Sequence, residues 1–135
     1  MALLLNIDVP DVAAGVRFYT AAFGLTVGRR FGTDLCELLG WPAPVYVLAK
    51  QAGTIGAGGD PRRYDRHWTP VHVDVLVDDV DSAVDRAVGA GAKLEAPAQD
   101  TPYGRIAMLA DPFGHGFCLL RFSERGYDAL LDEAD

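Results

Sequence analysis

The sequence between residues 71 and 79 alternates strictly between two kinds of side chain, and this alternation predicts a β-strand. Valines occupy every second position, and the positions between them carry His72, Asp74 and Leu76. Because successive side chains of a strand point to opposite sides, the imidazole and the carboxylate share the face opposite the valines. Apolar residues at helical spacing follow in residues 80–91, so we expect the valine face to pack against that helix.

The same succession of elements occurs about 68 residues earlier in the chain. A strand over residues 3–9 leads into a helix that Asp11 caps and Gly24 ends, and Asp79 and Gly91 hold the matching places in the second half. Three further strands are expected after each helix, at 25–30, 34–39 and 45–50 and again at 92–95, 103–110 and 115–122. An internal repeat of this kind predicts two βαβββ modules.

We therefore expect one α+β domain that consists of two tandem modules. Module one covers residues 1–50, a linker covers 51–69, module two covers 70–123, and a polar tail covers 124–135. One helix can cover only one face of a four-stranded sheet, so the remaining faces are expected to form a curved, mostly antiparallel sheet with the helices outside. Such an arrangement predicts a concave pocket for a small ligand.

Charge and composition restrict the partners of such a pocket. The chain has 19 acidic and 12 basic residues, a net charge of −7, which argues against nucleic acid or an anionic membrane surface as a partner. No apolar run reaches transmembrane length, and the first residues lack the basic start of a signal peptide. The two cysteines, Cys36 and Cys118, are too few for a disulfide framework and fit a reducing cytoplasm, so we expect a cytoplasmic protein.

Short motifs along the chain resemble, in the right order, those of the vicinal oxygen chelate superfamily. This superfamily includes glyoxalases, bleomycin-resistance proteins, ring-cleaving dioxygenases and fosfomycin-modifying enzymes. The residues that carry the resemblance are Asp11, Phe18-Tyr19, Phe23-Gly24-Leu25, the run from His72 to Asp79, Gly91-Ala92 and Asp111-Pro112-Phe113-Gly114-His115. The resemblance spans nearly the whole chain and implies the same fold as the internal repeat.

The resemblance also implies metal ligands on the first and last strand of each module, usually His or Gln first and Glu last. In this chain those places correspond to Leu4, His72, Leu48 (to within one residue) and Cys118. A divalent ion needs three or four oxygen, nitrogen or sulfur donors, and here only His72 and Cys118 supply them. We therefore expect no metal ion and no other cofactor, with one divalent metal as the alternative.

The candidate site residues are those that the repeat directs toward the pocket or whose rings can stack on a ligand. His72 and Asp74 are the candidate catalytic pair, since an imidazole with a pKa of about 6.5 suits acid–base chemistry. A carboxylate in a concavity is costly unless it is paired, so we expect Asp74 to meet either Arg105 or a cationic ligand. The candidate ligand-binding residues are Asn6, Leu4, Tyr46, Leu48, Trp68, Tyr103, Arg105 and Cys118.

Two functions fit these candidates. The first is metal-independent binding of a small hydrophobic or aromatic molecule, including a cationic one, above an apolar floor of Leu4 and Leu48. The alternative is a glyoxalase-like lyase or isomerase that uses His72 and Asp74 as an acid–base pair or holds an atypical metal ion. His72 as a relic of a metal site, Cys118 as ordinary core, and a domain without any small-molecule site remain open. A homodimer is the expected assembly.

Overall fold

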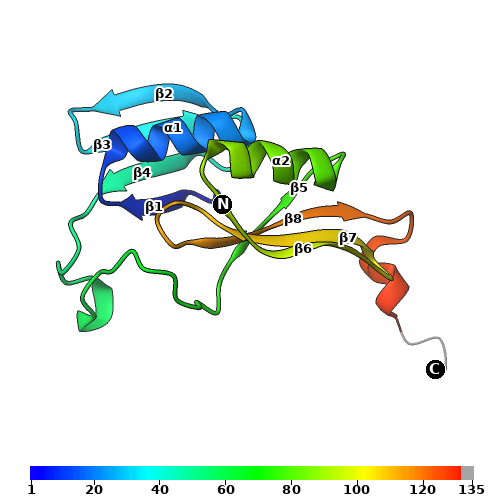
Figure 1. The fold of residues 1–135 in the computed structure, drawn as a ribbon. Coiled ribbons are helices and arrows are strands. Elements are labelled where there is room, and N and C mark those ends of the chain that lie inside the picture. Colours follow the sequence, from blue (N-terminus) through cyan, green and yellow to red (C-terminus); the bar gives the residue numbers. More distant parts are fainter. Residues whose placement is uncertain (132–135) are drawn as a thin grey trace. The chain divides into compact units, whose positions relative to one another are not determined.

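The structure, a computed structural model, describes residues 1–131 and divides the chain into two compact units, Met1–Arg66 and His67–Asp135. Each unit contains one four-stranded sheet and one helix that packs against it (Figure 1). Both sheets contain one parallel and two antiparallel strand pairs, so the predicted α+β class and the mostly antiparallel pairing are confirmed. None of the helices formed by the described residues has the length and apolar character that a membrane crossing needs.

The first unit follows the predicted order of one strand, one helix and three strands. Its elements are β1 (Leu5–Val9), α1 (Val12–Phe23), β2 (Thr26–Phe31), β3 (Leu35–Leu39) and β4 (Val45–Ala49). The strands lie in the order β1-β4-β3-β2, with β1 parallel to β4. The Asp11 carboxylate accepts a hydrogen bond from the Ala14 amide, and Gly24 ends the helix at φ 68°, as the sequence predicts.

The core of the first unit lies between α1 and the sheet. Phe18 is the largest of its fully buried side chains, with only 2% of its surface exposed. Gly15 allows the helix to approach the sheet, because a Cβ atom at this position would lie 2.7 Å from Val47 Cγ1. This side of the sheet is therefore filled, and the opposite side carries the polar residues that matter for the site.

The second unit repeats the arrangement. Its elements are β5 (Val73–Leu76), α2 (Val80–Ala90), β6 (Lys93–Thr101), β7 (Gly104–Ala110) and β8 (Gly116–Phe122). The strand order is β5-β8-β7-β6, with β5 parallel to β8, and Asp79 caps α2 through the Ser82 amide at 3.1 Å. The strand predicted at 92–95 is too short, because β6 continues through Pro97 to Thr101 across two register shifts that interrupt the alternation.

The predicted linker, residues 51–69, is mostly attached to the first unit. It contains a short 3-10 helix, η1 (Ala57–Gly59), next to a bridge between Ile55 and Pro61. Arg62 Nε donates to Asp8 Oδ2 at 2.9 Å, which ties this segment to β1. In the predicted tail, Gly126–Leu130 forms a second 3-10 helix, η2, and residues 132–135 lie outside the described residues.

Candidate functional site

The open face of the second sheet, opposite α2, brings three predicted residues together. Strand pairing sets Asp74 on β5 against Cys118 on β8, and His72 directly precedes β5. His72 Nε2 lies 3.2 Å from Asp74 Oδ1. One donor atom each from His72, Asp74 and Cys118 lies within 4.8 Å of the others. The alternation read from the sequence therefore predicts correctly that His72 and Asp74 share a face, and Cys118 lies at the position that the family resemblance implies.

The environment of Cys118 keeps its thiol protonated. The residue is 6% exposed and belongs to an apolar cluster with Ile106 and Leu120, against which Tyr103 packs. Burial, followed by the nearby Asp74 carboxylate, raises the pKa of Cys118 to about 11. The uncharged form of the thiol is therefore the stable one at neutral pH. Cys118 is thus poorly suited to act as a nucleophile.

The donor set of His72, Asp74 and Cys118 fits a metal ion in type but is incomplete. Imidazole, carboxylate and thiolate are all ligands of Zn²⁺, and Asp74 adds a third donor to the two counted from the sequence. A structural zinc site needs a fourth ligand, and a catalytic site fills that place with water or substrate. Binding would also have to remove the proton from a thiol whose pKa is raised.

The open face of the first sheet carries a second polar cluster, which the sequence analysis did not identify as a whole. Glu37 on β3 is only 6% exposed. Its carboxylate accepts hydrogen bonds from Arg29 Nη2 at 2.7 Å, from Tyr46 Oη at 2.8 Å and from the Arg29 amide at 3.1 Å. Gly28 makes room for this carboxylate, because a Cβ atom there would lie 2.5 Å from Glu37 Oε1.

Arg29 balances the charge of the buried carboxylate. Its hydrogen bonds, together with that from Tyr46, lower the pKa of Glu37 from 4.5 to about 2, and Glu37 in turn raises the pKa of Arg29. Tyr46 also accepts a hydrogen bond from Arg29 Nη2 at 3.2 Å. A single glutamate within the apolar strand Leu35–Leu39 was the signal that could have revealed this cluster.

We expect acid to destabilise the first unit through Glu37. A carboxylate whose pKa is lowered in the folded state stabilises that state above its unfolded pKa, here about 4.5, and loses the contribution as the pH falls through the folded value. The contribution should therefore disappear between about pH 5 and pH 2. In thermal melting followed by circular dichroism, the melting temperature of Glu37→Gln should lie well below that of the native protein at pH 6 and close to it at pH 2.5. A difference in melting temperature that stays constant with pH would contradict the lowered pKa of Glu37.

Strand register also corrects the position that corresponds to Cys118 in the first unit. β1 pairs Asn6 with Tyr46, just as β5 pairs Asp74 with Cys118. Asn6 and Asp74 are equivalent in the repeat, so Tyr46 is the counterpart of Cys118. Leu48, which the sequence suggested to within one residue, lies two residues further along β4.

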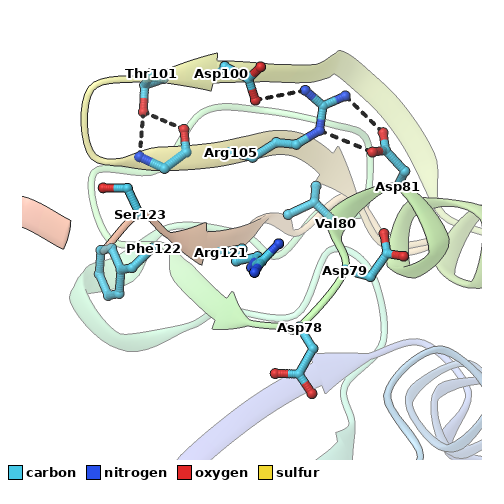
Figure 2. A pocket seen from close by; sticks show the side chains of 11 residues that line it. Asp78, Asp79, Val80, Asp81, Asp100, Thr101, Arg105, Arg121, Phe122 and Ser123 are labelled. Carbon is cyan, nitrogen blue, oxygen red and sulfur yellow. Dashed lines mark hydrogen bonds and ion pairs between the residues drawn. The ribbon is translucent and has the colours of Figure 1, made fainter. Parts of the chain in front are cut away.

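Arg105 lies on the helix side of its sheet, and the expectation that it meets Asp74 is wrong. The next residue, Ile106, packs on the open face, and strand alternation turns Arg105 the other way. Its guanidinium forms ion pairs with Asp81 at 3.0 Å and Asp100 at 2.9 Å, as Figure 2 shows. These contacts raise the pKa of Arg105 and lower that of Asp81.

The same ion pairs line a pocket of about 500 Å³ beside the start of α2 (Figure 2). Four aspartates and two arginines contribute to the wall, and Asp79, Asp81 and Asp100 are engaged in the helix cap or in pairs with Arg105. This charged lining differs from the apolar concavity expected from the sequence. Among the predicted site residues, Arg105 alone lines this pocket.

The remaining predicted residues are distributed over both units. Leu4 is 56% exposed and Asn6 is also exposed, at the edge strand of the first sheet. Trp68 is 78% exposed. Tyr103 packs against Tyr127 in a tilted arrangement with a ring-centroid distance of 5.3 Å. The structure thus groups Asn6 with Tyr46 by register, whereas it shows no described partner ring for Trp68.

Comparison with known proteins adds a family assignment and several relatives. The sequence model of the glyoxalase-like domain matches residues 5–120. The anthracycline biosynthesis protein DauV of Streptomyces sp. (strain C5) is 36% identical over 131 residues, covering 92% of this chain and 42% of DauV. The protein Mb0911c of Mycobacterium bovis is 30% identical over 132 residues, covering 87% of this chain and 81% of Mb0911c. The chain therefore spans about two fifths of the length of DauV.

Solved structures show the same fold. The fosfomycin resistance protein FosX from Listeria monocytogenes superposes with a TM-score of 0.70 at 15% identity, covering 97% of this chain and 98% of FosX. TioX from Micromonospora sp. ML1 superposes with a TM-score of 0.69 at 24% identity, covering 91% of this chain and 99% of TioX. At these identities the likeness concerns the fold alone, whereas the match of the glyoxalase-like domain model over residues 5–120 confirms the superfamily suggested by the sequence motifs.

Proposed function

The chain belongs to the glyoxalase-like family of the vicinal oxygen chelate superfamily, and from this premise we propose that it binds a small aromatic molecule without the help of a metal ion. The binding surface is the open face of its sheets, where polar clusters lie beside apolar side chains. Affinity comes from buried apolar area and ring contacts, and the polar groups orient the ligand.

The observation that carries this proposal is the internal pairing of the acidic groups on both open faces. Glu37 is buried and neutralised by Arg29, so its carboxylate is not available to a metal cation. Asp74 Oδ1 lies 3.2 Å from His72 Nε2, and a donor atom of Asp74 lies within 4.8 Å of the buried Cys118 sulfur, whose pKa is raised. The acidic groups on both open faces are therefore already engaged by protein groups, which disfavours binding of a metal ion there.

The names of the relatives support the aromatic class of ligand. DauV is described as an anthracycline biosynthesis protein, and anthracyclines are planar aromatic compounds. The exposed Phe31 and the half-buried Leu35 and Leu48 offer an apolar surface for such a molecule. A net charge of −7 favours a cationic ligand over an anionic one.

Metal analysis of the purified native protein tests the proposal. We expect far less than one equivalent of Zn, Ni, Fe or Mn per chain. In a separate titration, His72→Ala should keep most of the affinity for an aromatic probe such as acridine orange, because ring contacts dominate binding. Asp85→Ala, an exposed helix position, serves as the control for surface substitution. About one tightly held metal ion per chain, lost in His72→Ala, would overturn metal-independent binding.

The second candidate is a glyoxalase-like lyase or isomerase. The observation that favours it is the approach of His72, Asp74 and Cys118 to within 4.8 Å of one another. His72 and Asp74 would act as an acid–base pair, or all three would hold one divalent ion as the Lewis acid. Zinc titration by calorimetry distinguishes the acid–base pair from the metal site. Only a metal site formed by these three residues gives one-to-one zinc binding that both Asp74→Asn and Cys118→Ser abolish.

The proposal also includes a cytoplasmic homodimer. Both cysteines are free and buried in the structure, which fits a reducing compartment. Light scattering during gel filtration measures the assembly, and twice the chain mass of 14.5 kDa is expected.

A further inference from the structure

An apolar strip runs across the open face of the first sheet, next to the cluster of Arg29, Glu37 and Tyr46. Strand register sets Leu48 on β4 against Leu35 on β3, and Leu35 against Phe31 on β2. Neighbouring strands lie about 4.8 Å apart, so three strands provide roughly 10 Å of apolar width. That width suits a planar molecule of two or three fused rings.

Arg29 stands at the border between the strip and the polar cluster. Its Nε and Nη2 atoms donate to the Glu37 carboxylate, and Nη2 also donates to Tyr46. Nη1 has no partner among residues 1–131, and the side chain is 66% exposed. The guanidinium lies over the Phe31 ring at 5.3 Å, so the free donor and the apolar strip belong to one surface.

We propose that Arg29 recognises a ring oxygen, carbonyl or phenolic, on a planar aromatic ligand that lies on the strip formed by Phe31, Leu35 and Leu48. This inference rests on the proposed function, because it specifies the class of aromatic molecule and assigns its recognition to the Arg29 guanidinium. The Nη1 hydrogens donate to the oxygen, and the fused rings cover the strip.

The contacts of Arg29 with Glu37 and Tyr46 explain why its guanidinium favours an oxygen on a neutral ring system over a free anion. Glu37 cancels the charge of the guanidinium, so long-range attraction for an anion is weak, whereas the two Nη1 hydrogens remain directed. Glu37 and Tyr46 also fix the side chain before a ligand arrives. Little conformational entropy is therefore lost when the hydrogen bond to the ligand forms.

Two planar, cationic and fluorescent probes separate oxygen recognition from simple stacking. Doxorubicin carries ring carbonyl and phenolic oxygens, and acridine orange has none. Titrations at 0.15 M and 0.5 M salt, the second to suppress nonspecific attraction of cations, are compared for the native chain and three variants. Arg29→Met removes the donor, Arg29→Lys keeps a positive partner for Glu37 but loses the planar fork, and Arg30→Met is the control on the adjacent position.

We expect both Arg29 variants to weaken doxorubicin binding about 10-fold or more, the effect of one hydrogen bond to a charged donor. Acridine orange binding should change less than about 2-fold, and Arg30→Met should change neither. Circular dichroism checks folding, and Arg29→Lys serves if Arg29→Met fails to fold. Equal losses of affinity for both probes, or no loss of affinity for doxorubicin, would overturn the role of Arg29 but not the proposed function. Absence of saturable binding of either probe by the native chain would overturn the proposed function together with this inference.

Discussion

Replacing Gly104 with alanine is expected to destabilise the second unit by about 3 kcal/mol or more. Gly104 adopts a φ of +151°, which L side chains rarely adopt, at the start of β7. A Cβ atom there would lie 2.0 Å from the carbonyl oxygen of Arg121 and 3.0 Å from Phe122 Cα. Backbone atoms of β8 cannot move aside without breaking the pairing of these two strands, so strain and steric overlap add together.

Thermal unfolding by circular dichroism measures this effect, and Gly89→Ala provides a matched control. Gly89 lies in α2 with nothing within 4 Å of the position that a Cβ atom would take. Alanine should stabilise the helix there by about 0.5–1 kcal/mol, because glycine is the poorer helix former. A Gly104→Ala variant that melts at the temperature of the native protein would show that the hairpin between β6 and β7 tolerates a side chain at this turn.

The features that the sequence predicts correctly depend on neighbours along the chain. The helix caps at Asp11 and Asp79 follow from side chains that bind amides three residues later. The grouping of His72 with Asp74 follows from strand alternation, which is local as well. Cys118 was placed with them by the resemblance to the superfamily, and the pairing of β5 with β8 sets it opposite Asp74.

The features that the sequence did not predict depend on pairing between strands. The cluster of Arg29 and Glu37 forms across a register shift between Val27 and Arg30, which no periodic pattern reveals. Arg105 was assigned to the wrong face because an error of one residue in a strand reverses every side chain. Tyr46 rather than Leu48 proved to be the counterpart of Cys118, a shift of two residues along β4 that keeps the same face of the strand.

These differences change the picture of the binding surface. The sequence suggests an apolar floor with His72 and Asp74 as its polar groups. In the structure the first unit contributes a neutralised pair, Arg29 and Glu37, that the sequence analysis left out. A ligand on that face would meet directed hydrogen-bond donors beside apolar side chains, which is the environment that the proposed function requires.

Phe18→Ala is expected to have the second large effect, a loss of about 3–5 kcal/mol in the stability of the first unit. Phe18 is 2% exposed and lies edge-on to Tyr19 at 5.0 Å and to Phe23 at 5.9 Å. Removing the ring leaves a cavity between α1 and the sheet that these aromatic neighbours cannot fill without leaving their own contacts. Helix packing should therefore weaken, although the capping of α1 by Asp11 is untouched.

Fluorescence of Trp41 during urea unfolding measures this loss within the first unit. Trp41 lies 5.1 Å from Phe23, so its emission follows the packing of α1, and a Trp68→Phe background removes the other indole. Val16→Ala is the control, because Val16 lies on the same helix but is only half-buried, and it should cost about 1 kcal/mol or less. If Phe18→Ala and Val16→Ala shift the midpoint equally, the core of the first unit is not centred on Phe18.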